Sequence, residues 1–293
     1  MVRSPEESFI TGFSRTISRL LPSNPAAYKG HSLPGRAQRW PLECQRFRDV
    51  PHSRAMSGND VDLQRKYFAD VAHEYDARIE EEFEHAFALS FLHGAIEQFG
   101  FQSVLDVGSG TGRAITYLRS KVPSLRLLGI EPVEALRKVG HGKGIPTTEL
   151  VDGDATAMPF ADGAFDVVCE FGVLHHIPHP ERAVAEMLRV ARRAVFISDS
   201  NNFGQGRPLV RAAKQIVNAL GMWRALDLVK TRGKGYTYSE GDGVAYSYSV
   251  FNSYDQVARA CKSVHVLNTD AGSWGVDPYR SAAHVALLGI LKS

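Results

Sequence analysis

The chain has 293 residues, and its formal net charge of +2 is close to balance. This length supports one substantial hydrophobic core with room for a cap or a tail. The charge balance gives no reason to expect a nucleic-acid or acidic-membrane partner. The three cysteines (Cys44, Cys169 and Cys261) are scattered, which argues against a disulfide framework and is typical of a reducing, cytoplasmic compartment. No apolar run reaches membrane-spanning length.

Residues 1–55 differ in composition from the rest of the chain. Basic residues outnumber acidic ones there, prolines interrupt the segment and apolar periodicity is poor, so we expect disorder. Three interpretations remain open: a transit peptide, a basic arm that contacts a partner, or an extension upstream of a natural start at Met56. We favour the last.

From residue 60 onward, apolar periodicity predicts alternating helices and strands. In chain order, we expect a helix from residue 60, a helix over 82–99, a strand over 103–107, a helix over 112–121, a strand over 125–130, a helix over 133–140, strands over 147–151 and 165–170, a helix over 180–191 and a strand over 193–198. Such alternation predicts an α/β fold whose parallel sheet carries helices on both faces.

Residues 200–250 interrupt this alternation and read as a cap insertion within a single domain over 56–293. We expect helices over 208–220 and 222–231, then a tyrosine-rich hairpin. With its turn centred on Asp242, Tyr238 would face Tyr246 and Tyr236 would face Tyr248. The tyrosines form either an aromatic wall for an apolar acceptor or plain cross-strand packing. A helix over 253–262 and strands over 263–268 and 282–291 complete the domain.

The segment Val104–Gly112 reads VLDVGSGTG, a strand that runs into a glycine loop. Its pattern is G-x-G-x-G, because Arg113 occupies the third glycine position of the dinucleotide motif G-x-G-x-x-G. Asp106 would also oppose a pyrophosphate and would favour a cationic ligand instead. An NAD-dependent dehydrogenase is therefore disfavoured.

At this point the sequence resembles the class I (Rossmann-like) S-adenosylmethionine-dependent methyltransferases, among them small-molecule and ubiquinone/menaquinone-type enzymes. Four stretches carry the resemblance in the family's order: 104–112, 127–132, 152–155 and 165–176. The resemblance implies a seven-stranded, mostly parallel sheet with an antiparallel last strand. It also implies S-adenosylmethionine as the cofactor.

Candidate cofactor-binding residues gather at the carboxyl ends of the predicted strands, where open α/β sheets bind ligands. They are Tyr75, Asp106, Gly108, Ser109, Gly110, Gly112, Glu131, Pro132, Asp154, Ala155, Glu170 and Phe171. By resemblance, Glu131 would accept hydrogen bonds from the ribose hydroxyls and Asp154 one from the adenine amine. The alternative is that each acid merely caps a helix. Tyr75 is either an element that closes over the cofactor or a packing aromatic.

His175 and His176 are the candidate catalytic residues, as general bases for the acceptor. A structural role that holds the loop to the backbone is the alternative. We expect no metal: His179 completes a His-His-x-x-His cluster, but no helical pair or nearby cysteine supports a site, and Pro178 and Pro180 break the geometry.

These features predict methyl transfer to an oxygen or a carbon of a small molecule, in a protein that is a monomer or a homodimer. Nitrogen is a less favoured target, because residues 170–173 (EFGV) lack the Asn/Asp-Pro-Pro-aromatic motif of relatives that methylate exocyclic amines. The alternative from another class is a non-catalytic S-adenosylmethionine-binding regulatory or partner protein.

Overall fold

The computed structural model describes residues 59–79, 82–270 and 281–292. The expectations for residues 1–55 lie outside these ranges. Within them, no helix has the length and apolar character needed to cross a bilayer.

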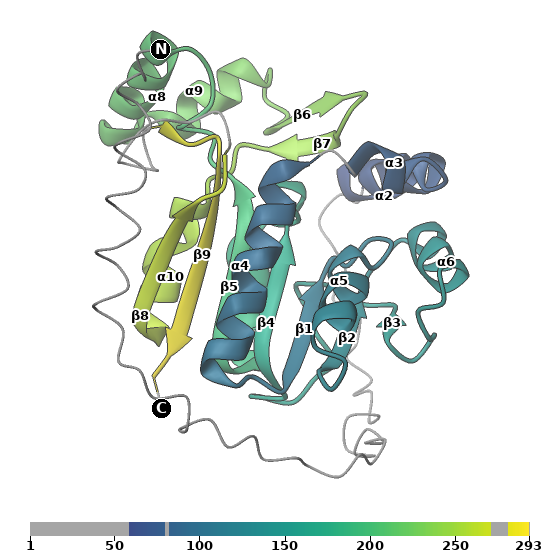
Figure 1. Cartoon of the computed structure of the whole chain (residues 1–293). Helices are drawn as coiled ribbons and strands as arrows, with labels where there is room; N and C mark the ends of the chain where they lie inside the picture. The colour runs from purple at the N-terminus through teal and green to yellow at the C-terminus, as the bar shows by residue number, and fades with distance from the viewer. Residues whose placement is uncertain (1–58, 80–81, 271–280, 293) are drawn as a thin grey trace, which may run out of the picture. The chain divides into compact units, whose positions relative to one another are not determined.

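The central element is a seven-stranded sheet (Figure 1). In spatial order its strands are β3 (Leu150–Val151), β2 (Arg126–Ile130), β1 (Ser103–Val107), β4 (Phe165–Phe171), β5 (Ala191–Ser200), β9 (His284–Leu291) and β8 (Cys261–Asn268). Strands β1 to β5 pair in parallel, whereas β9 is antiparallel to both β5 and β8. The predicted mostly parallel sheet with an antiparallel last strand is confirmed.

Helices cover both faces of the sheet because its central strands are apolar on both sides. On one face, α4 (Phe83–Phe99) and α5 (Arg113–Lys121) join a buried cluster with sheet residues such as Val104 and Phe196. On the other face, α7 (Pro180–Val190) and α10 (Val250–Ala260) contact each other. Figure 1 shows α4 in front of the sheet and α10 behind it.

Two boundaries differ from the sequence-based expectation by three residues, and the others by at most two. The strand predicted over 147–151 is only Leu150–Val151. The helix predicted over 253–262 begins earlier, at Val250, because Ser249 and Asn252 form a capping box in which the Ser249 hydroxyl accepts from the Phe251 amide. The prediction used apolar spacing and overlooked this cap.

The insertion folds as α8 (Pro208–Ala219), α9 (Trp223–Lys230) and a hairpin of β6 (Tyr236–Ser239) and β7 (Gly243–Tyr246). The predicted hairpin register is wrong: Tyr236 pairs with Tyr246, and Tyr238 pairs with Val244. The turn closes between Ser239 and Gly243, where the Asp242 amide donates to the Ser239 hydroxyl. Tyr248 therefore lies outside the hairpin, where it is buried and its hydroxyl forms a hydrogen bond with the Ser253 hydroxyl.

The cover, as we call residues 59–79 and 236–246, lies over the carboxyl ends of the parallel strands (Figure 1). It consists of α2 (Asn59–Val71), α3 (Tyr75–Ile79) and the β6–β7 hairpin. Four hydrogen bonds tie α2 to the hairpin. Gln64 Oε1 accepts from the Val244 amide, and Gln64 Nε2 donates to the Asp242 carbonyl. The Tyr67 hydroxyl donates to the Glu240 carbonyl, and the Tyr246 hydroxyl donates to Asp60.

Replacing Gly129 in β2 with alanine should destabilise the fold by about 1–3 kcal/mol through overpacking. A Cβ there would lie 2.5 Å from Ser109 Oγ and 2.8 Å from Ile115 Cδ1. Urea denaturation measures the effect. The matched control is Gly94→Ala in α4, where nothing lies within 4 Å of the added Cβ; alanine should there stabilise the helix by about 0.5–1 kcal/mol. Equal effects of the two substitutions would contradict the packing argument.

Candidate active site

The glycine loop between β1 and α5 turns back over the end of β2. Gly108, Gly110 and Gly112 have φ angles of +67°, +56° and +83°, which only glycine adopts without strain. The Ser109 amide donates to the Ile130 carbonyl at 2.9 Å and fixes the loop to β2. The loop therefore presents backbone, not side chains, at the carboxyl edge of the sheet.

Two buried carboxylates flank this loop, and neither forms a salt bridge with a described residue. Asp106 accepts from the Ser109 hydroxyl at 2.6 Å, and burial raises its pKa to about 6. Glu131 accepts from the Gly110 amide at 3.0 Å and the Val133 amide at 2.9 Å, and burial raises its pKa to about 7. The charges of Arg113 and Arg137 offset only part of the burial cost of these two groups, and a cationic, hydroxyl-bearing ligand would offset more of it.

Tyr75 closes the loop from above. A Cβ on Gly110 would lie 3.3 Å from its ring, and burial raises the pKa of its phenol. The next residue, Asp76, accepts from Thr111 Oγ1 at 2.5 Å and from Lys143 Nζ at 2.8 Å. These bonds fasten α3 to the loop. That Tyr75 closes over the cofactor stays a prediction.

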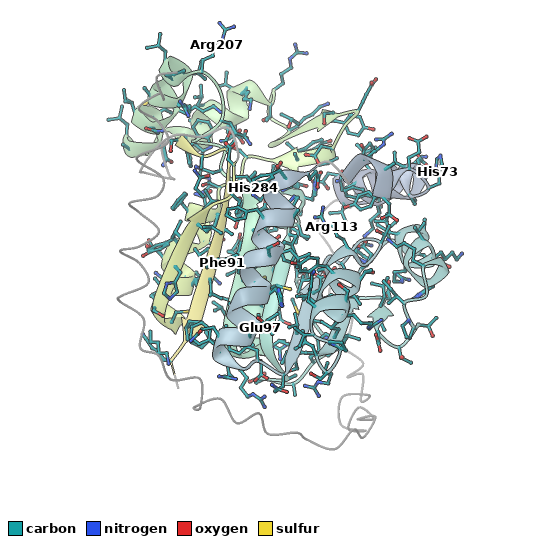
Figure 2. The ribbon with its side chains drawn as sticks, in the orientation of Figure 1. His73, Phe91, Glu97, Arg113, Arg207 and His284 are labelled. Atoms are coloured by element: carbon teal, nitrogen blue, oxygen red, sulfur yellow. The ribbon has the colours of Figure 1, made fainter. Side chains whose placement is uncertain are left out.

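Arg113 stands where the dinucleotide motif has its third glycine, and it begins α5 near the upper edge of the sheet (Figure 2). Its guanidinium donates to Glu82 at 3.1 Å. This ion pair joins the start of α5 to the residue preceding α4, so the arginine has a structural partner at the mouth of the loop.

Two hollows lie at this edge. The one over the loop has a volume of only about 20 Å³ and is lined by Tyr75, Asp106, Gly108, Ser109, Thr111, Arg113, Ala114 and Phe171. The other has a volume of about 420 Å³, where α2 meets the start of α6 (Glu134–Gly142), and Pro132 and Val133 line it. Ligand pockets usually have about 300–1,000 Å³. The hollow over the loop is therefore too small for a nucleoside-sized ligand in this arrangement, and we expect the cover to move away from the loop when such a ligand binds.

The other two predicted cofactor-binding acids, Asp154 and Glu170, differ in their exposure to solvent. Asp154 is exposed and accepts from the Thr156 amide and hydroxyl, next to Ala155, and its other oxygen lies 3.7 Å from Arg65. Glu170 is fully buried and accepts from the Val173 and Ser198 amides at 2.9 Å. Burial and the Asp199 charge raise the Glu170 pKa well above its usual value, so this acid holds loops together rather than facing either hollow.

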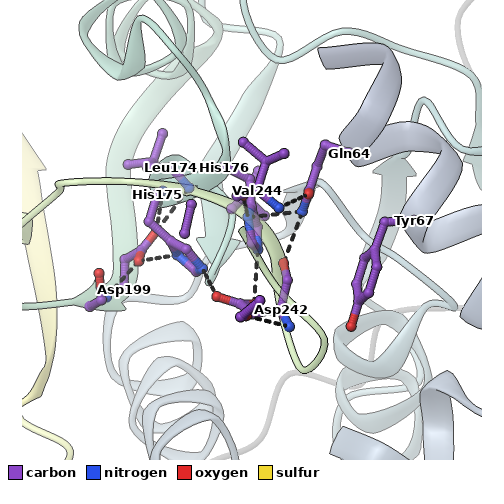
Figure 3. A network of polar contacts seen from close by, with 12 residues as sticks. Gln64, Tyr67, Leu174, His175, His176, Asp199, Asp242 and Val244 are labelled. Atoms are coloured by element: carbon purple, nitrogen blue, oxygen red, sulfur yellow. Dashed lines mark hydrogen bonds and ion pairs between the residues drawn. The ribbon is translucent and has the colours of Figure 1, made fainter. Parts of the chain in front are cut away.

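His175 and His176 lie in a short 3₁₀ helix, Leu174–His176, directly after β4 (Figure 3). His175 Nδ1 lies 2.6 Å from Asp199, and His175 Nε2 lies 3.5 Å from Asp242. Burial alone would lower the His175 pKa, but the Asp199 charge and the hydrogen bonds to both acids outweigh it and raise the pKa well above its usual value. An imidazolium cannot accept a proton, which argues against a general-base role for His175 in this arrangement.

Sequence reasoning missed Asp199, Asp242 and Gln64. Asp199 lies near the end of β5, fully buried, and accepts from the Leu174 and His175 amides at 2.8 and 3.2 Å. The rule used for the other acids, an acid near a strand's carboxyl end, would have found it. The sequence pattern marks Asp242 only as a turn residue. No local pattern marks Gln64, whose side chain hydrogen-bonds to the hairpin and to His176.

The tyrosine hairpin makes the contacts of cross-strand and helix packing. The Tyr236 and Tyr246 rings lie 6.1 Å apart edge to face, and Tyr238 meets Tyr67 of α2 at 6.2 Å. The aromatic-wall interpretation stays a prediction for the open form of the cover.

Residues 105–197 match the family model described as "Methyltransferase domain". This part of the chain is a methyltransferase domain. Demethylmenaquinone methyltransferase of Renibacterium salmoninarum is 37% identical over 91 residues, which cover 31% of this chain and 37% of that protein. Phosphatidylethanolamine N-methyltransferase of Cereibacter sphaeroides is 32% identical over 124 residues, covering 40% and 61%. The matches span less than two thirds of either relative.

Solved structures agree with this assignment at the level of the fold. The 1,6-didemethyltoxoflavin-N1-methyltransferase of Burkholderia thailandensis, solved with 1,6-didemethyltoxoflavin and S-adenosylhomocysteine, superimposes with a TM-score of 0.53 at 16% identity. The superposition covers 83% of this chain and 94% of that one. The methyltransferase domain thus has the class I fold, for which the sequence resemblance implies S-adenosylmethionine as the cofactor.

The polar groups of the methyltransferase domain at this site suit the charged and hydroxyl groups of that cofactor. S-adenosylmethionine carries an ammonium, a sulfonium and two ribose hydroxyls. Asp106 and Glu131 are buried acceptors without a salt-bridge partner among the described residues, and Gly108 and Gly110 put backbone beside them, under the Val173 and Tyr75 side chains. The dehydrogenase alternative has no support in these matches.

Proposed function

We propose that the chain is an S-adenosylmethionine-dependent methyltransferase that acts on a small molecule. The observation that supports this most is the pair of buried carboxylates, Asp106 and Glu131, on either side of a glycine loop within a methyltransferase domain. Desolvation makes these charges costly, and a cation and hydroxyl donors would offset the cost.

In this proposal Glu131 accepts from the ribose hydroxyls, and Pro132 and Val133 line the nucleoside end. Asp106 and the backbone of Gly108, Ser109 and Gly110 face the methionine end. Tyr75 and Phe171 close the space above the loop, and Gly112 allows α5 to start beneath it. Asp154 and Ala155 would meet the adenine once the Arg65 contact opens. Glu170 acts indirectly, through Val173 and Ser198.

The cofactor supplies an activated methyl group on sulfur. An acceptor lone pair forms a bond to that carbon, the carbon–sulfur bond breaks with its electrons leaving on sulfur, and the acceptor loses a proton. The chain's own residues align the two partners and exclude water beneath the cover, which is most of what such a displacement requires.

The acceptor atom is proposed to be oxygen or carbon, since residues 170–173 lack the amine-methylating motif. The relatives' names include both a demethylmenaquinone methyltransferase and an N-methyltransferase, so amines belong in the test. We place the protein in the cytoplasm, in keeping with free, buried Cys169 and Cys261.

The decisive experiment supplies methyl-labelled S-adenosylmethionine together with a panel of phenols, hydroquinones and amines. Label in hydroxyl or carbon acceptors is expected. Label in amines alone would overturn the acceptor assignment. Binding of S-adenosylhomocysteine without any transfer, across the panel and across metabolites of the source cell, would favour the non-catalytic binding protein.

S-adenosylhomocysteine affinity should increase with pH and level off above about pH 7, because the ligand binds the ionised carboxylates. The pKa values of Glu131 and Asp106, raised to about 7 and about 6, mean that protons must leave these groups below that pH before the ligand binds. Calorimetry in two buffers of different ionisation enthalpy measures the released protons. Affinity that stays constant between pH 5.5 and pH 8, with the protein folded throughout, would contradict the assignment.

A further inference from the structure

Three side chains from two distant parts of the chain, the loop after β4 and the hairpin of the cover, bring ligand atoms together (Figure 3). Asp242 Oδ2 lies 3.5 Å from His175 Nε2, and Asp242 Oδ1 lies 3.3 Å from His176 Nε2. One donor atom from each of the three lies within 4.8 Å of the others. Two ligands of a tetrahedral metal ion, each about 2.1 Å from it, are about 3.4 Å apart. The two His–Asp separations are close to this value, and the set as a whole, within 4.8 Å, would have to draw closer together around an ion.

The opposite nitrogen of each imidazole is held by a fixed acceptor. His175 Nδ1 meets Asp199, which is fully buried, at 2.6 Å. His176 Nδ1 lies 2.7 Å from the Val244 carbonyl, to which it donates in the tautomer that leaves Nε2 free, and 3.0 Å from Gln64 Nε2. Metal-binding histidines almost always donate their second N–H to a carboxylate or a backbone carbonyl, which fixes the tautomer and directs the other lone pair at the metal. Here both Nε2 atoms are directed at Asp242.

The competing explanation is that protons alone hold the cluster, with the Asp242 carboxylate accepting from both imidazole rings. That arrangement and a metal site share the same contacts, because a metal ion takes the place of the Nε2 protons. They differ in consequence: only a metal site has measurable affinity for an ion, and that affinity depends on all three side chains.

We propose that His175, His176 and Asp242 bind one divalent transition-metal ion of the zinc or cobalt class at the acceptor end of the site. The set of two imidazoles and one carboxylate suits such ions rather than Mg²⁺, which prefers oxygen ligands. The remaining coordination position is available to a hydroxyl of the acceptor, a role that rests on the proposed function. Along the sequence, the third histidine of the cluster is His179. In the structure His179 is exposed and pairs with Glu181, so it is not the third ligand of the proposed site.

The test titrates the untagged, chelator-treated full chain with Zn²⁺ in a calorimeter and with Co²⁺ by its visible absorption. One ion per chain is expected, with no comparable binding of Mg²⁺. Asp242→Asn and His176→Ala should each weaken Zn²⁺ binding by at least about 100-fold, since even a hydrogen-bond partner of a ligand is worth about 10–100-fold. The matched control is His179→Ala, which should bind like the parent.

Asp242 lies in an exposed hairpin turn, so its variant is expected to fold, and a thermal melt checks this. No Zn²⁺ binding by the parent, or equal binding by the Asp242→Asn and His179→Ala variants, would overturn the proposal. S-adenosylhomocysteine binding by the chelated protein is measured in parallel. Its loss would count against the proposed function, whereas its retention without Zn²⁺ binding would count against the metal site alone.

Discussion

Replacing Glu131 with glutamine should weaken S-adenosylhomocysteine binding by about 100-fold, or about 2.8 kcal/mol. Glutamine keeps one of the two acceptor oxygens, so one of the two hydrogen bonds from the ribose to an ionised acceptor would be lost, and such a bond contributes about 1.5–3 kcal/mol. The Glu131 oxygens also accept from the Gly110 and Val133 amides, one each. A glutamine amide can accept from only one of them and turns its NH₂ group towards the other, so the loop shifts as well. Calorimetry with the purified variant measures the loss.

The matched control is Glu97→Gln in α4. Glu97 is exposed, pairs with His93, and lies towards the opposite end of the sheet from Arg113 in Figure 2. This variant should bind S-adenosylhomocysteine like the parent. Binding by the Glu131→Gln variant within about threefold of the parent, or about 0.7 kcal/mol, would remove Glu131 as the ribose acceptor.

Replacing Asp199 with alanine should lower the free energy of unfolding by about 3–5 kcal/mol at pH 7, the usual cost of breaking a buried ion pair by removing one partner. The carboxylate accepts from the Leu174, His175 and Ser200 amides and from His175 Nδ1. The variant leaves three backbone N–H groups and an imidazole without their acceptor. Urea denaturation at pH 7 measures the loss.

The pH dependence of this effect has a definite sign. Burial would raise the Asp199 pKa, but the charge and hydrogen bond of His175 lower it below its usual value. Its stabilising contribution is therefore complete above about pH 4, the unfolded-state pKa, and is lost as the pH falls further. The difference between parent and Asp199→Ala should shrink in that acid range. The control, Asp162→Ala, removes an exposed partner of Arg189 and should leave stability close to the parent's. A loss as large in the control would contradict the burial argument.

The sheet and the glycine loop were predictable because their signals are local. Alternating apolar strands and helices, and glycines at positions 108, 110 and 112, each specify a backbone conformation within a few residues. Asp106 and Glu131 were predictable from their position near the ends of strands, because parallel strands bring their carboxyl ends to one edge of the sheet.

The cover and the histidine cluster were not predictable in this way. The hairpin register depends on whether the turn closes at Gly243, which is decided by contacts with Gln64 and Tyr67 in a helix far away in the sequence. Asp242 meets His175 and His176 only because that hairpin lies on α2. Sequence spacing does not predict such a contact, because tertiary packing determines which residues come together.

The bonds that fasten α3 to the loop have a kinetic consequence. Thr111 and Lys143 hold Asp76, and the ring of Tyr75 lies over Gly110. A nucleoside bound beneath that ring can leave no faster than these contacts break. In the proposed function, the opening rate of this five-residue helix is therefore an upper limit on the rate at which S-adenosylhomocysteine leaves the site and ceases to inhibit the next turnover.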